Sequence, residues 1–155
     1  MIFRNKQFYG RFIGQPISAQ KLFCDLPAAT KKRLNSICRQ KNALEGEIIT
    51  EDNEFSNKIF VLQSGQAEMR FKNNLNKKNT VRLVENNEII GLTQFISDSP
   101  NQINIVTLTP CLWDFFPAQD FLQLLNADCQ LCFRLSQIIS SDIQKSYLSF
   151  LDEKY

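Results

Sequence analysis

The chain has 155 residues, a hydrophobic fraction of 43%, a charged fraction of 22% and a formal net charge of +2. This length and composition predict one soluble globular domain, and the small net charge argues against a nucleic-acid partner. Histidine is absent, so the chain lacks the residue most often used for acid–base catalysis and for metal binding.

The N-terminal segment is basic and aromatic but lacks the continuous apolar stretch of a secretory signal. We interpret residues 1–17 as an N-terminal arm, with contact to a partner as the alternative role, and residues 18–155 as the domain. No apolar run approaches the roughly 18 residues of a membrane span. The five cysteines form no even-numbered disulfide framework, so reduced thiols and a cytoplasmic location are expected.

The first part of the domain predicts two helices. Ser18 is placed to cap a short helical turn, and Pro27 stands at the start of a second helix. Leu34, Ile37 and Cys38 then recur at helical spacing. We expect these three side chains to face the core.

From Leu44 the pattern changes to short runs rich in Ile, Val, Phe and Thr, separated by Asn, Gly or Lys. The runs are EGEIIT, KIFVLQSG, QAEMRFK, TVRLVE, NEIIG, QINIVTLT and CLWDFF. Their spacing is typical of antiparallel strands. In the third run, Ala67, Met69 and Phe71 alternate with charged residues, so one face of that strand is expected to be buried. The polar run 73–79 predicts a hairpin tip.

After Pro117 the helical period returns. Residues 120–125 predict a short helix, and Asp128 is placed to cap a long helix that ends near Leu151. The long helix carries one broad apolar stripe. The stripe residues with a candidate role are Leu131, Leu135, Ile138, Ile139, Ile143 and Tyr147.

The ordered set of short motifs resembles the cyclic-nucleotide-binding domains, including the sensor domains of Crp/Fnr-type regulators. The resemblance runs from about Lys21 to about Leu151. It rests on KLFCDLP, GEI at 46–48, FVLQSGQAE around Gly65, EIIG before the loop, and TPCLWDF followed by DFLQLL. It implies a mainly β fold: an antiparallel β-roll (jelly roll) with N-terminal helices and a long C-terminal helix.

The resemblance also implies where a ligand would bind. In the family, the segment after the glycine of EIIG is a phosphate-binding cassette, whose Glu bonds the ribose and whose Arg pairs with the cyclic phosphate. Here Gly91 and Pro100 match, but the Glu position is Leu92 and the Arg position is Asn101. The degenerate pocket would comprise Gly91, Leu92, Thr93, Gln94, Ser99, Asn101 and Gln102.

The loss of both charged anchors sets the expected affinity. A hydrogen bond to a charged group contributes about 1.5–3 kcal/mol, so two lost anchors weaken binding roughly 10²–10⁴-fold. We therefore expect no ordinary cAMP or cGMP binding. The alternative is that a basic residue elsewhere in the chain replaces the missing Arg at the phosphate. The candidates for this displaced base are Lys72, Lys77, Lys78 and Arg82, and a lysine would not restore the bidentate geometry of an arginine.

Three hypotheses about function remain open. In the first, the pocket holds a different, less anionic ligand through Thr93, Gln94 and Asn101. In the second, the pocket is filled by the chain's own side chains, with Leu92 and Phe95 the first candidates. The third hypothesis is a thiol sensor. We favour a regulatory or signalling module that is not an enzyme and needs no cofactor.

Cys129 and Cys132 form a CxxC motif at the start of the long helix. Such a pair can be redox-active or bind a metal, but a metal needs two further ligands, and no second CxxC or histidine supplies them. We favour structural thiols beside the apolar stripe and expect no metal site.

The resemblance implies a parallel homodimer through the long helix, and the stripe would form its seam if its residues are exposed in the monomer. Regulators of this kind continue into a helix-turn-helix after that helix. The chain ends at Tyr155, so we expect no direct DNA binding, and the alternatives are a stand-alone module or the sensor fragment of a transcription regulator. A protein partner would carry the signal of a stand-alone module.

Overall fold

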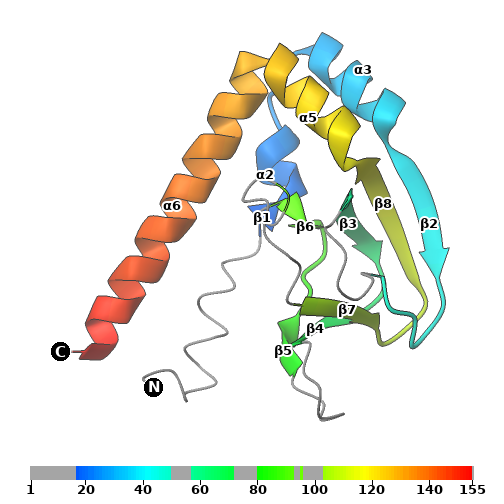
Figure 1. The fold of residues 1–155 in the computed structure, drawn as a ribbon, viewed down its shortest axis with the longest axis vertical. Helices are drawn as coiled ribbons and strands as arrows, with labels where there is room; N and C mark the ends of the chain where they lie inside the picture. Colours follow the sequence, from blue (N-terminus) through cyan, green and yellow to red (C-terminus); the bar gives the residue numbers. More distant parts are fainter. Residues whose placement is uncertain (1–16, 50–56, 72–79, 93–94, 96–102, 155) are drawn as a thin grey trace.

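The computed structural model describes residues 17–49, 57–71, 80–92, 95 and 103–154 (Figure 1). The helices are α2 (Ala19–Phe23), α3 (Ala28–Ile37), α5 (Ala118–Ala127) and α6 (Cys129–Lys154). The strands are β1 (Ile17–Ser18), β2 (Arg39–Ala43), β3 (Lys58–Ser64), β4 (Ala67–Phe71), β5 (Thr80–Leu83), β6 (Glu88–Ile90), β7 (Ile103–Thr107) and β8 (Cys111–Pro117).

The strands form two antiparallel sheets, as the β-roll prediction requires. One sheet has five strands in the order β1-β6-β3-β8-β2, and the other has three in the order β5-β4-β7. Helices α3 and α5 lie beside one another at one end of the roll, and α6 extends from there to the C-terminus (Figure 1). The helices hold more of the described residues than the strands because α6 is long, so the fold is β in its core rather than by residue count.

Strand β3 is buried on both faces and separates two apolar clusters. Phe60 and Leu62 face the interior of the roll, which we define as the cluster between the two sheets that also contains Met69, Ile90 and Trp113. The alternate residues of β3 join the other cluster, which lies between the five-stranded sheet and the helices. The apolar run at the start of β3 therefore serves two cores at once.

The predicted strands from Lys58 onward are confirmed, and the alternation within β4 is confirmed too. Ala67 and Met69 are buried and Phe71 packs against the roll interior. The prediction of a strand in EGEIIT is wrong for its described part. Glu45 and Gly46 form a turn, and Ile48 makes only an isolated bridge to Val106.

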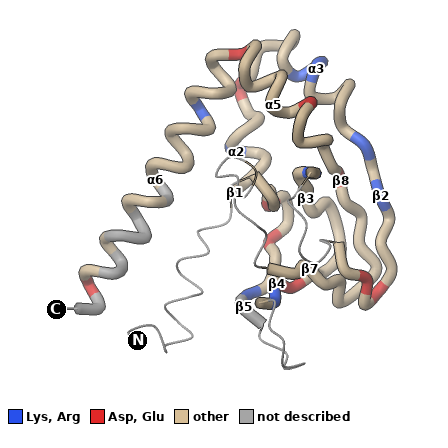
Figure 2. Tube along the Cα trace, viewed as in Figure 1, with Lys and Arg blue, Asp and Glu red and all other residues tan. Residues whose placement is uncertain are grey.

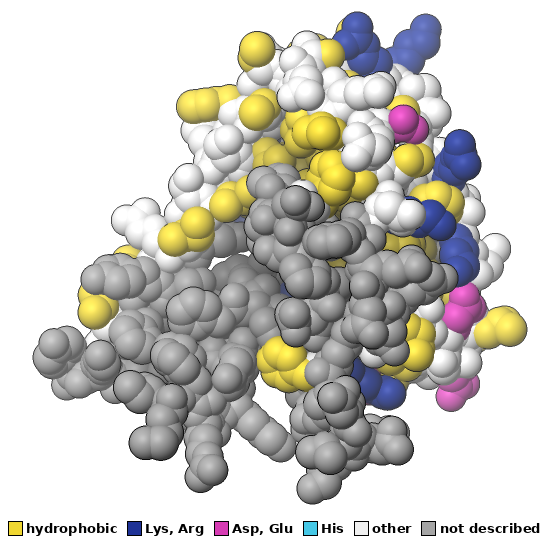
Figure 3. Space-filling model, in the orientation of Figure 1, with side chains coloured by type: hydrophobic (Ala, Val, Ile, Leu, Met, Phe, Trp, Pro, Cys, Tyr) yellow, Lys and Arg dark blue, Asp and Glu magenta, His cyan; other side chains and the backbone are white. Residues whose placement is uncertain are grey.

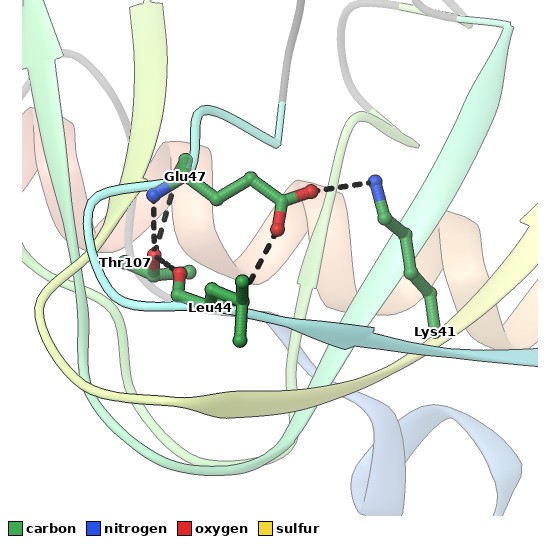
Figure 4. A network of polar contacts seen from close by, with 4 residues as sticks. All are labelled: Lys41, Leu44, Glu47 and Thr107. Atoms are coloured by element: carbon green, nitrogen blue, oxygen red, sulfur yellow. Dashed lines mark hydrogen bonds and ion pairs between the residues drawn. The ribbon is translucent and has the colours of Figure 1, made fainter.

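That turn joins the two sheets through a polar network (Figure 4). The Thr107 hydroxyl donates to the Leu44 carbonyl at 2.5 Å and accepts from the Glu47 backbone N–H at 2.9 Å. One Glu47 oxygen accepts from the Leu44 backbone N–H and the other pairs with Lys41, each at 3.0 Å. The hydrogen bond from Lys41, followed by the one from Leu44, lowers the pKa of Glu47. The GEI motif thus ties β2 to the end of β7.

Caps fix the helix starts as the sequence predicts. The Ser18 side chain accepts from the Lys21 backbone N–H, and the Asp128 side chain accepts from the Leu131 backbone N–H at 3.0 Å. The second Asp128 oxygen accepts from the Thr30 hydroxyl of α3. The Thr30 bond is the main cause of a lowered Asp128 pKa. Asp128 therefore attaches the start of α6 to α3 as well as capping it.

Candidate functional site

The loop after β6 begins as the cassette of the family would. Gly91 has φ +95°, a conformation that residues with a side chain rarely adopt. The Phe95 backbone N–H donates to the Gly91 carbonyl at 3.0 Å. Gly91 therefore has the positive φ that favours a glycine at this point of the chain.

Leu92, at the position of the family's Glu, does not face solvent. It is 1% exposed and belongs to the apolar cluster that Phe121 of α5 and Leu131 of α6 also join. A carboxylate at this place would have apolar neighbours rather than a ribose hydroxyl. Leu92 thus packs toward the helices and is not a member of the cluster in the roll interior.

The remaining pocket residues predicted from the sequence are Thr93, Gln94, Ser99, Asn101 and Gln102, and all lie outside the described residues. Among the candidate displaced bases, Lys72, Lys77 and Lys78 also lie outside them. Gly91, Leu92 and Arg82 are the candidates that the structure places.

Arg82 of β5 forms a bidentate ion pair with Glu88 of β6. Its Nη1 lies 2.9 Å from Glu88 Oε2 and its Nη2 lies 2.5 Å from Glu88 Oε1. Glu88 is only 2% exposed. Arg82, which is the candidate base nearest to the cassette in the sequence, is therefore already paired with the buried carboxylate of Glu88.

Trp113 and Arg82 each carry a buried donor that has no partner among the described residues. Trp113 is fully buried in the roll interior, with its ring edge-on to Phe60 at 6.2 Å between centroids. Its indole Nε1 and the Arg82 Nε have no hydrogen-bond partner in the part of the chain that the structure describes. Unpaired buried donors are uncommon.

The apolar stripe of α6 divides along its length. Leu131 and Leu135 are 0% and 4% exposed and pack within the chain, and Ile138 and Ile139 are partly buried beside them. Ile143 is 65% exposed. A dimer seam requires residues that are exposed in the monomer. Leu131 and Leu135 do not meet this condition, because they are buried in the chain's own core. Apolar side chains remain visible along α6 (Figure 3), and the Tyr147 side chain lies outside the description.

The cysteines are all unpaired, and Cys129 and Cys132 are both exposed. This exposure does not fit the interpretation of the pair as packed structural thiols. Cys111 is buried, and burial is the main cause that raises the pKa of its thiol.

In the described ranges, no group of His, Cys, Asp or Glu is arranged to hold a metal ion. No described helix is both long and apolar enough to cross a membrane.

Basic residues follow one edge of the molecule, along α3 and the edge strand β2 (Figure 2). Arg39 and Lys41 of β2 are exposed at the end of the five-stranded sheet. Charged side chains on an edge strand oppose pairing with another chain. We attribute these residues to protection of the edge rather than to the pocket.

Glu88 is the residue that sequence reasoning missed. In the sequence it stands only as part of the EIIG motif, although its spacing of two from Ile90 indicates a shared strand face. Its partner Arg82 lies across the β5–β6 connection. A pairing of this kind becomes visible only once the register of β5 is known.

Comparison with known proteins agrees with this geometry. Residues 40–128, more than half of the chain, match the cyclic nucleotide-binding domain. No curated protein is significantly similar to the chain.

Among solved structures, the catabolite activator protein of Thermus thermophilus superposes with a TM-score of 0.70 at 14% identity, over 84% of this chain and 61% of that one. The N-terminal domain of a transcriptional regulator from Streptomyces coelicolor gives 0.68 at 16% identity, over 83% and 91%. The sensor domain of the regulator DNR from Pseudomonas aeruginosa gives 0.66 at 16% identity, over 80% and 81%. The roll, the glycine-led loop and the match over residues 40–128 together show that the chain belongs to the cyclic nucleotide-binding domain family.

Proposed function

We propose that the chain is a non-catalytic regulatory module whose β-roll does not bind cAMP or cGMP in the usual way. The observation that carries the proposal is Leu92, which is 1% exposed at the position where the family resemblance expects a ribose-binding Glu. The similar structures support the regulatory part, because they include an N-terminal domain and a sensor domain of transcriptional regulators. We also propose a cytoplasmic location, which the five unpaired thiols support.

Two features of the site work against a cyclic nucleotide. The ribose loses a charged acceptor because Leu92 is apolar and buried. The phosphate loses its Arg, and Arg82, the described candidate to replace it, is paired with Glu88. Each missing charge-assisted bond weakens binding by roughly tenfold or more.

Calorimetric titration of the purified protein with cAMP, cGMP and a cyclic dinucleotide tests the proposal. We expect no binding tighter than about 0.1 mM, which is a micromolar site weakened by two lost anchors. Micromolar binding of any of the three would contradict the proposal. Such a result would point to a base that enters the site from elsewhere.

The second candidate function is a sensor of a different small ligand in the same pocket. The unpartnered indole Nε1 of Trp113 favours it, because a carbonyl or hydroxyl oxygen that reached the roll interior would satisfy this donor. A screen of uncharged metabolites by thermal denaturation distinguishes the two candidates. A ligand that raises the melting temperature and that loses its effect in Trp113→Phe supports the sensor; no such ligand supports the self-filled module.

We further propose that the distal half of α6 pairs with the same helix of a second copy. Ile143 and Leu148 are 65% and 52% exposed, so two large apolar side chains of the distal half of α6 are not covered by the described part of the chain. Light scattering across a concentration series is the measurement. Ile143→Glu should weaken dimerisation at least about tenfold, since it replaces buried apolar surface by a charge. Gln144→Glu, at an exposed neighbouring position, is the matched control and should not change it. A monomeric wild-type protein, or equal effects of the two variants, would contradict this pairing.

A further inference from the structure

The Arg82–Glu88 pair lies on the inner faces of its strands. Arg82 is opposite Met69 in the β4–β5 register, and Met69 is 5% exposed in the roll interior. Residues directly opposite in antiparallel strands share a face of the sheet. Glu88 is two residues from Ile90, which also belongs to the roll interior, so it shares that face as well. Both side chains therefore project toward the interior.

The Glu88 carboxylate has the contacts that an oxyanion ligand would have. It receives the two Nη groups of Arg82 as a fork, and its Oε2 also accepts from the Glu85 backbone N–H at 2.9 Å. A guanidinium fork together with a backbone N–H is a common way to hold a phosphate or carboxylate. These groups would form an oxyanion site if Glu88 did not fill it.

Arg82 makes three side-chain hydrogen bonds in the described part of the chain. Besides the fork to Glu88, Nη1 donates to the Leu83 carbonyl at 3.0 Å. The buried Nε is left without a partner in the described part of the chain. Since the Arg82–Glu88 pair is neutral as a whole, this spare N–H suits an uncharged acceptor better than a second anion.

We propose that Glu88 is an internal anion that occupies Arg82 and excludes anionic ligands from the roll. Arg82 is a latent oxyanion-binding residue, and Glu88 determines specificity against phosphate. Any ligand that the roll accepts is then an uncharged small molecule with a hydrogen-bond acceptor. This inference rests on the proposed function and supplies a cause for it beyond the substitutions in the cassette.

A matched control exists on the other face of β4. Arg70 pairs with Glu68, and the two side chains are 24% and 12% exposed, compared with 22% and 2% for Arg82 and Glu88. Glu68 and Arg70 alternate with the inward-facing Met69, so they lie on the outer face of the sheet. Glu68→Gln changes the net charge by the same amount as Glu88→Gln but releases an arginine on the outside.

The experiment is calorimetric titration with inorganic phosphate of the wild type, Glu88→Gln, Glu68→Gln and the double variant Arg82→Gln/Glu88→Gln. We expect phosphate to bind Glu88→Gln about 10- to 100-fold more tightly than the wild type, because the competing carboxylate is removed. Glu68→Gln should match the wild type. The double variant should lose the gain, because the guanidinium is gone.

Equal phosphate affinity of Glu88→Gln and the wild type overturns the inference. An equal gain in phosphate affinity in Glu68→Gln also overturns it, because it would show a general effect of net charge. If Glu88→Gln does not fold, Glu88→Ala replaces it, since it also removes the carboxylate from Arg82. A gain in Glu88→Ala then supports the inference and no gain overturns it. Failure of the proposed function is seen separately, as micromolar binding of a cyclic nucleotide by the wild type.

Discussion

Leu92→Glu is expected to lower the free energy of unfolding by about 4 kcal/mol or more, because it places an unpaired carboxylate in an apolar cluster. The substitution restores the residue type that the family resemblance expects at this position. Leu92 is 1% exposed among residues of α5 and α6, so the restored Glu would have no ribose and no water to bond. Urea denaturation at neutral pH measures the loss.

The matched variant is Leu92→Met, which keeps volume and polarity and should cost less than about 1.5 kcal/mol. A loss for Leu92→Glu within about 1 kcal/mol of that for Leu92→Met would contradict the packing described here. It would indicate that position 92 opens toward solvent, as a ribose-binding residue requires.

Gly65→Ala is expected to destabilise the fold by about 2–5 kcal/mol. Gly65 has φ +95°, and an added Cβ would meet the Pro110 carbonyl oxygen, Cys111 Sγ at 2.7 Å and Cys111 Cα at 2.9 Å. The left-handed backbone costs about 1–2 kcal/mol for a residue with a side chain, and overpacking adds about 1–3 kcal/mol. The turn between β3 and β4 therefore depends on the absence of a side chain.

Gly46→Ala separates the two contributions. Gly46 also has a positive φ, +80°, but an added Cβ would have no atom of the described residues within 4 Å apart from its own chain neighbours. We expect a loss of only about 1–2 kcal/mol, from the backbone alone. Equal losses for the two variants in urea denaturation would contradict the close approach of β8 to Gly65.

The sequence predicts strands where an apolar run or an alternation is visible and fails at β2, where neither is present. Strand β3 is recognisable because both of its faces are apolar, and β4 because its polar residues alternate. Strand β2 was missed because its first four residues, Arg39 to Asn42, are exposed and carry no alternation. Only its pairing with β8 reveals it as a strand.

At the cassette, too, the residue types predict one part of the result and the packing in the structure shows another. Comparison of residue types identifies Leu92 as a departure from the family, but only the packing shows that Leu92 belongs to the core. Likewise, the stripe of α6 is periodic throughout, yet Leu135 is buried while Ile143 is exposed. Periodicity states which face of a helix is apolar and does not state where the rest of the fold stops covering it.

Trp113 can report directly on whether the roll takes up cAMP or cGMP. It is the only tryptophan of the chain and is fully buried in the roll interior, so its indole N–H gives a single signal in a ¹H–¹⁵N spectrum from the inside of the roll. We would follow that signal during titration with cAMP and then with cGMP. We expect the indole signal to stay in place up to about 0.1 mM nucleotide. A saturating shift at micromolar nucleotide would contradict it.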